Sequence, residues 1–138
     1  MNNTDASWPL HRAVIKQLKG DTALKALVGE KLIIRDQDQA TVSYPHIKIG
    51  DSFTNAWQSA TFDGQEHEFS LHLWSREGGS EKSKEIASAV INLLHNADFP
   101  IPGHALVDLQ FESAETRYRK DKGAYHCLIR FKGLTVSD

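Results

Sequence analysis

The sequence predicts a single α+β domain in which helices pack on one face of a single, mostly antiparallel β-sheet. Apolar residues recur at helical spacing in some segments and alternate with polar residues in others. These segments follow the order α-α-β-β-β-α-β-β, and one face of the strand segments is polar, which is typical of a sheet covered on one side. A chain of 138 residues suits one core, so we expect one domain over residues 1–138, with residues 1–6 flexible.

Two helices are expected at the start of the chain. Apolar residues recur at helical spacing between Ser7, the expected N-cap, and Gly20, a natural C-terminal stop. Asp21 is then expected to cap a shorter helix over residues 22–28, which Gly29 closes. Such a pair of helices would cover one face of the sheet.

Three strands are expected next. Residues 31–35 form a short strand candidate, and residues 46–53 alternate until Gly50-Asp51 breaks the pattern. The polar stretch 55–64 is expected to be a loop or a hairpin end, with a turn at its end.

The clearest strand covers residues 65–76. One face of it carries apolar side chains and one histidine: His67, Phe69, Leu71 and Leu73. The other face is polar, with one large aromatic: Glu66, Glu68, Ser70, His72 and Trp74. That polar face must meet water or a partner.

A third helix and a hairpin complete the expected fold. The helix follows Gly78-Gly79, with Ser80 as its expected cap and an apolar stripe along one side. In the hairpin, the apolar residues expected on one face are Val107, Leu109 and Phe111 going out, and Tyr125, Cys127, Ile129 and Phe131 returning. The turn is expected near residues 120–122, with Gly123 free to take a positive φ.

Composition limits the classes of protein. Sixteen Lys and Arg against 18 Asp and Glu give a net charge of -2, so the chain has no overall attraction for nucleic acid or anionic lipid. The single cysteine, Cys127, cannot form an intrachain disulfide, which fits a reducing compartment such as a cytoplasm. No signal peptide and no apolar run of about 20 residues is visible, so we expect no membrane partner.

The residues with reactive side chains favour no metal and no cofactor. The segment 67–72 (HEFSLH) resembles a zinc-protease motif, but it has one residue too many and its histidines point to opposite faces of a strand. Ser70, His72 and Glu68 share one face, which leaves a small soluble hydrolase as an alternative reading. Ser70 lies in mid-strand rather than on an exposed elbow, so we expect no catalytic residues.

Three groups of side chains are candidates for contacts with other proteins. Large aromatic residues outside the expected core are typical of protein interfaces: Trp57, Phe62 and Trp74. A basic cluster lies at the expected hairpin tip, and a binding module using it is a second alternative: Arg117, Arg119, Lys120 and Lys122. The third group is acidic: Glu66 and Glu68 on the polar strand face, together with Asp51.

The whole pattern resembles a known family. The segments that carry the resemblance are LHRAVIKQLKGDTALKALVG, YPHIKIGD, HEFSLHLWSREGG, KSKEIASAVINLLHNA and YHCLIRFKG, in this order. Together they span about residues 9 to 133 and resemble the tail-completion, or tail-terminator, proteins of long-tailed phages, prophages and gene transfer agents. YPHIKIGD and HLWSREGG are the most specific of these pieces, and none is a catalytic motif.

This resemblance implies a structural role and no enzymatic activity. Such proteins form a ring, usually sixfold, on the head-proximal end of the tail tube, where the ring ends tube polymerisation and joins the tail to the head. The expected partners are therefore copies of the chain itself, the tail tube protein and a connector protein of the neck, with DNA passing through without sequence-specific binding. The expected location is the neck of a virion tail, assembled in the host cytoplasm.

Overall fold

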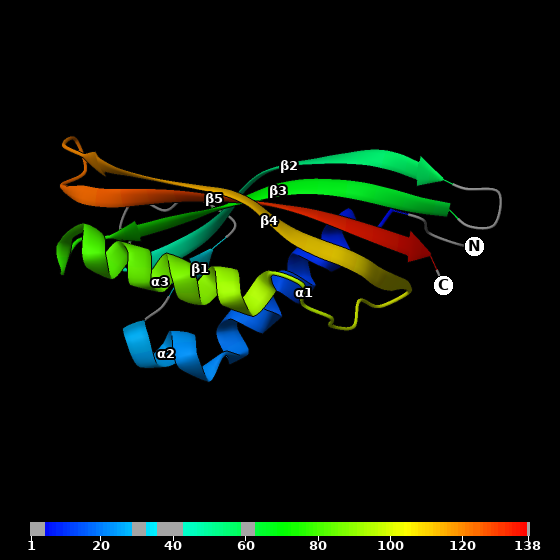
Figure 1. The fold of residues 1–138 in the computed structure, drawn as a ribbon, viewed down its shortest axis with the longest axis horizontal. Coiled ribbons are helices and arrows are strands. Elements are labelled where there is room, and N and C mark those ends of the chain that lie inside the picture. The colour runs from blue at the N-terminus through cyan, green and yellow to red at the C-terminus, as the bar shows by residue number, and fades with distance from the viewer. Residues whose placement is uncertain (1–4, 29–32, 36–42, 59–62, 138) are drawn as a thin grey trace.

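The computed structural model describes residues 5–28, 33–35, 43–58 and 63–137. Figure 1 shows the helices beneath one long, twisted sheet. The elements in chain order are α1 (Ser7–Gly20), α2 (Thr22–Val28), β1 (Ile33–Arg35), β2 (His46–Gln58), β3 (Asp63–Ser75), α3 (Gly79–Leu94), β4 (His104–Arg119) and β5 (Ala124–Ser137). This order confirms the α+β fold that the sequence predicts.

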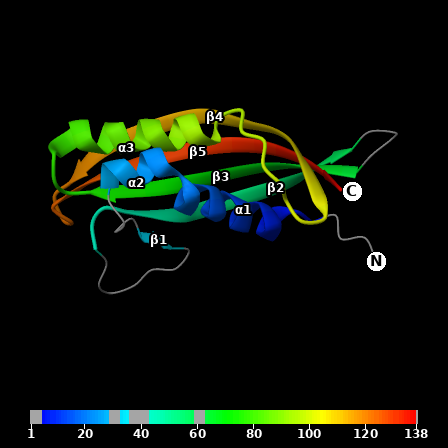
Figure 2. The same cartoon turned by 90° about the horizontal axis from the view of Figure 1, so that it is seen from below.

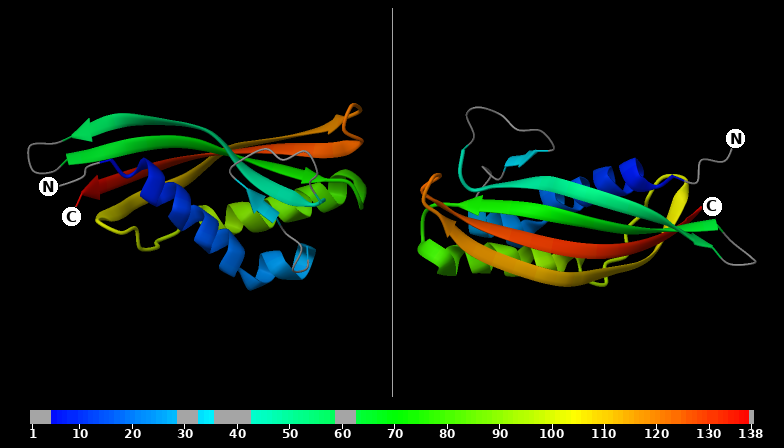
Figure 3. Two further views of the ribbon diagram at one scale, coloured as in Figure 1. Left: turned by 180° about the vertical axis from the view of Figure 1, so that it is seen from behind. Right: turned by 90° about the horizontal axis from the view of Figure 1, so that it is seen from above.

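The sheet has the strand order β1-β2-β3-β5-β4. The long strands pair antiparallel, whereas β1 pairs parallel with β2 at its first residues. All three helices lie against the same face (Figure 2), and the opposite face is open when the molecule is viewed from the other side (Figure 3, right). None of the helices in the described part of the chain is long and apolar enough to cross a membrane.

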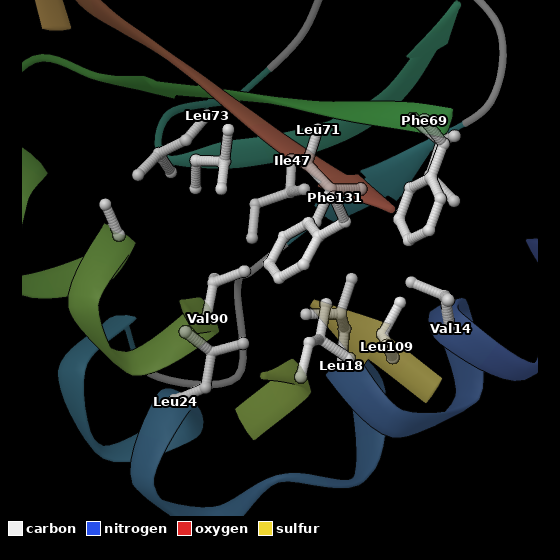
Figure 4. Packing of buried hydrophobic residues seen from close by; sticks show 14 of the residues in the cluster. Val14, Leu18, Leu24, Ile47, Phe69, Leu71, Leu73, Val90, Leu109 and Phe131 are labelled. Carbon is white, nitrogen blue, oxygen red and sulfur yellow. The ribbon is translucent and has the colours of Figure 1, made fainter. Parts of the chain in front are cut away.

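The core lies between the sheet and the helices (Figure 4). Alternate residues of β3 and β5 supply its upper layer, and Phe131 stacks on Phe69 with ring centroids 5.6 Å apart. The apolar stripes of α1 and α3, which include Leu18 and Val90, supply the lower layer. Burying each of these side chains contributes roughly 1.5–3 kcal/mol.

One of the three expected helix caps is confirmed, and two are wrong. The Asp21 carboxylate accepts a 2.8 Å hydrogen bond from the backbone N–H of Leu24, so Asp21 caps α2. The N-cap of α1 is Ala6 and that of α3 is Gly78, so Ser7 and Ser80 already lie inside their helices. Gly78 takes a φ of 80°, a conformation that suits glycine, and α3 begins two residues earlier than expected.

β-Bulges change which side chains face the core. The register shifts between Ile49 and Ser52, where the sequence pattern breaks. A second shift between Leu106 and Asp108 turns Val107 outward, where 52% of it is exposed, and Leu106 packs against the core instead. The expectation that Val107 faces the core is therefore wrong, because one extra residue reverses the alternation.

The stretch 55–64 is mostly strand rather than loop. β2 continues to Gln58 and β3 begins at Asp63, so Trp57 lies on a strand, opposite Gly64. Phe62 falls outside the described residues. At the other end of the sheet the expected turn is confirmed, because Gly123 has a φ of 61° and closes the β4–β5 hairpin.

Candidate functional site: the open face of the sheet

The open face carries the polar row of β3 that the sequence predicts. Trp74, His72 and Ser70 alternate with buried core residues and lie opposite His126, Leu128 and Arg130 of β5. We call the side of the sheet away from the helices the open face. All the candidate interface residues that the structure describes lie on this face or at the hairpin that extends it.

Aromatic rings form a stack at the hairpin end of the open face. The His126 ring lies between His72 and Trp74, with centroids 5.0 Å and 4.3 Å away. His46 continues the stack at 6.5 Å from Trp74, and the Arg119 guanidinium lies 5.9 Å from the centroid of Trp74. Trp74 and Arg119, two separate predictions from the sequence, are thus brought into one cluster.

The two histidines of this stack are hydrogen-bonded to each other. His72 Nδ1 and His126 Nε2 lie 2.7 Å apart, so one ring must be neutral for the hydrogen bond to exist. Burial is the main cause that lowers the pKa of His126 to about 4; the neighbouring His72 and Arg119 also lower it, and Glu115 opposes them. At neutral pH the His126 ring is therefore neutral, and the charged Arg119 guanidinium lies beside it over Trp74.

We expect this pKa to make the fold less stable in acid. The pKa of His126 is about 4 in the folded state against an ordinary value of 6.5, so the unfolded chain binds more protons between those pH values. The stabilisation is complete above pH 6.5 and is lost as the pH falls towards 4. An NMR titration of the His126 ring should give a midpoint near 4; a midpoint near 6.5 would contradict the stacked geometry.

The row Ser70, His72 and Glu68 does not form a catalytic arrangement. The Ser70 hydroxyl donates to the backbone oxygen of Asp51 at 3.4 Å, and His72 Nδ1 is directed at His126. The other edge of the His72 ring lies over Gly50, where an added Cβ would come within 2.3 Å of Nε2. These contacts hold the bulge of β2 against β3, which is a structural role.

Charges of both signs alternate in the middle of the open face. Glu66 forms a 3.3 Å ion pair with Lys132, and this contact raises the pKa of Lys132. Glu68 is exposed and lies opposite the same lysine on β5, while Asp51 is exposed at the bulge. The acidic residues are therefore interleaved with basic ones rather than gathered into a single negative patch.

The hairpin tip is less basic than its sequence predicts. Arg117 pairs with Glu115, and Arg119 pairs with Asp121 at 3.4 Å. Lys120 and Lys122 are exposed at the turn. Acidic neighbours thus compensate part of the charge, which weakens the case for nucleic-acid binding at the tip.

Trp57 lies at the other end of the open face from Trp74. It is half-buried and covers Gly64, where an added Cβ would come within 2.8 Å of its ring. Two residues of the open face were not predicted from the sequence. His126 precedes the buried Cys127, so alternation alone could have placed it there; Phe53, 60% exposed, could not be placed because the bulge reverses its alternation.

The buried polar groups beneath the sheet are structural. His67 lies between Thr54 and Thr135, at 3.1 Å and 2.9 Å, and burial lowers its pKa. Cys127 is fully buried, and burial raises the pKa of its thiol. Within the described ranges no group of three or more His, Cys, Asp or Glu side chains is placed to hold a metal ion.

Comparisons with solved structures show the fold first. The chain aligns over 98% of its length with 100% of a chain in the virion of a native gene transfer agent particle, at a TM-score of 0.85 and 24% identity. It also aligns over 93% of its length with 89% of the gp17 protein of bacteriophage SPP1, at a TM-score of 0.59 and 20% identity. At these identities the likeness shows a shared fold. No curated protein matches the sequence.

The family is shown by the sequence itself. Residues 12–135 match the family described as tail completion protein gp17, so the chain belongs to that family. It is a structural component of a phage-like tail and not an enzyme. This overturns the alternative reading of a hydrolase using Ser70, His72 and Glu68.

Proposed function

We propose that the protein forms a ring on the head-proximal end of the tail tube, where it ends tube polymerisation and joins the tail to the head. The family match over residues 12–135 carries this proposal. The ring is sixfold, its partners are the tube protein and a connector protein of the neck, and it is assembled in the host cytoplasm. DNA passes through it without sequence-specific binding.

The open face is suited to the inner wall of such a ring. A ring needs two different contact patches on each subunit. Because the helices cover one face of the sheet, the open face is available to line the inside of the ring. The interleaved Glu66, Glu68 and Lys132 give that face no strong charge of one sign. A wall of this kind neither grips nor repels phosphates, which favours passage of DNA.

Tube growth in vitro tests the function. Tube subunits of the same particle are polymerised with and without the protein, and tube lengths are measured by electron microscopy. We expect the protein to bind one end of each tube and to shorten the length distribution in proportion to its concentration. Tubes that grow to the same length with the protein bound nowhere, or bound along their sides, would contradict the proposal.

A further inference from the structure

Two stretches of strand have no neighbouring strand on one side among the described residues. β1 pairs only with residues 46–48 of β2, which leaves residues 51–56 as the β2 edge. β4 is the last strand of the sheet, and its middle is covered because Phe111 donates its N–H to His95 Nδ1 at 3.0 Å. Beyond that contact residues 113–119 form the β4 edge. The two edges lie at opposite ends of the sheet (Figure 3, right).

Backbone groups on both edges point outward at residues whose side chains face the helices. The Leu109 carbonyl accepts a 2.8 Å hydrogen bond from Asn96, so it points away from β5. Leu109 lies in one cross-strand row with Gly133, His67 and Thr54. Hydrogen-bonded and non-hydrogen-bonded pairs alternate along such a row. Leu109 and Gly133 exchange no backbone hydrogen bonds, Gly133 and His67 do, and His67 and Thr54 do not. Thr54 therefore turns its N–H and C=O away from β3.

The same rule identifies the outward groups of the β4 edge. Past the second bulge of β4, Thr116 lies opposite the buried Cys127 and therefore faces the helices. Its backbone groups point outward, as do those of Ala114, and on the β2 edge those of Ala56. Both edges thus present a regular set of backbone donors and acceptors to water.

The direction of the strands allows the two edges to pair. The long strands of one subunit alternate in direction in the order β2-β3-β5-β4, so β2 and β4 run in opposite directions. A second copy related by rotation about a ring axis would therefore present its β2 edge antiparallel to the β4 edge of the first. Antiparallel pairing gives perpendicular hydrogen bonds between such edges.

If Thr54 of one copy lies opposite Thr116 of the next, the offset between the two edges suits a closed ring. Thr116 shares a cross-strand row with Leu73, whereas Thr54 shares a row with His67, six residues away along β3. Six residues span about 20 Å, and the four long strands of each subunit span about 19 Å across the sheet. Neighbouring copies that lie at the same height along the ring axis must then have strands inclined by about 45° to that axis. This inclination is close to the strand tilt of closed β-barrels.

The short β1 fits the same arrangement. It lies beside residues 46–48 of β2, which are about 20 Å along the strand from Thr54 on the β2 edge. With the offset above, β1 of one copy would lie in line with the β4–β5 turn of its neighbour, just beyond the tip. The strand that limits the β2 edge therefore leaves room for the neighbouring hairpin.

We propose that neighbouring subunits pair the β2 edge of one copy with the β4 edge of the next, which joins their sheets into one continuous barrel with the helices outside. This rests on the proposed ring. Aligning Thr54 with Thr116 sets Asp51 against Arg119, which are opposite charges. It also places Phe53, 60% exposed in the single chain, beside the Arg117 side chain. A second copy is therefore the partner that matches both edges.

Proline substitutions test the pairing. Ala56 and Ala114 have outward N–H groups, so Ala56→Pro and Ala114→Pro remove no hydrogen bond within the subunit sheet but block pairing at the edge. We expect both variants to keep the wild-type circular dichroism and melting temperature, and to need about tenfold more protein to cap tubes. The matched controls Ala56→Thr and Ala114→Thr keep the N–H and should cap like the wild type.

Cross-linking provides a second measurement that does not depend on the proline variants folding. Asn55→Cys and Glu115→Cys combined in one chain should give a ladder of disulfide-linked species on capped tubes after oxidation. The control pair Asn55→Cys and Ser88→Cys, with Ser88 exposed on α3, should give none.

The outcomes separate the two proposals. Wild-type protein that does not cap tubes would overturn both the function and the pairing. Wild-type capping with folded proline variants that cap equally well, or with no ladder from the Asn55 and Glu115 pair, would overturn edge pairing alone.

Discussion

Replacing Phe131 by alanine should lower the free energy of unfolding by about 3–5 kcal/mol. Phe131 is fully buried on β5, stacks on Phe69, and meets Phe111 edge-on at 6.1 Å. Strands from the middle and the edge of the sheet meet at this ring, so the cavity cannot close without moving both. Total stability of a domain is about 5–15 kcal/mol, so the loss is a large part of it.

Urea unfolding followed by circular dichroism measures this change. Phe53→Ala is the matched control, because Phe53 is 60% exposed in the isolated chain and its truncation should change stability by about 0.5 kcal/mol or less. A loss below about 1 kcal/mol for Phe131→Ala would show that this ring does not fill the core between the middle and the edge of the sheet.

Gly64→Ala should be the second most damaging change, at about 1–3 kcal/mol. An added Cβ would come within 2.6 Å of the Trp57 carbonyl oxygen and 2.9 Å of the Thr135 carbonyl oxygen. These are backbone atoms of two neighbouring strands, so β2 or β5 must move. The Trp57 ring, 2.8 Å from the same point, would also be displaced from the open face.

Thermal unfolding and tryptophan fluorescence follow both effects. Gly20→Ala is the control, because an added Cβ there meets nothing within 4 Å and should leave stability unchanged or raise it by up to about 1 kcal/mol. Equal melting temperatures for the two variants would contradict the close approach of the strands at Gly64.

The sequence was sufficient to predict the order of elements and the polar row of β3. Strict alternation over residues 65–76 places each side chain of β3 correctly, because the strand lies between two others and has no register shift in its pairing with β5. Asp21 was equally predictable, because its cap depends only on the next three residues. Local sequence signals were sufficient where the structure depends only on residues close together in the chain.

The wrong predictions concern features that depend on residues far apart in the sequence. Val107 faces water because a bulge shifts the register of β4 against β5, which no local pattern records. Trp57 lies on a strand because its polar neighbours pair with β3 across the sheet. The stack of His72, His126 and Trp74 joins residues up to 54 positions apart, so it emerges only when β3 and β5 pair.

Electron cryomicroscopy of the ends of capped tubes would show directly whether the protein forms a ring there. We expect a closed ring of copies at one end of each tube, with the helices on its outer wall and the open face towards the lumen. Single copies attached along the tube wall, or a ring with its helices around the lumen, would contradict it.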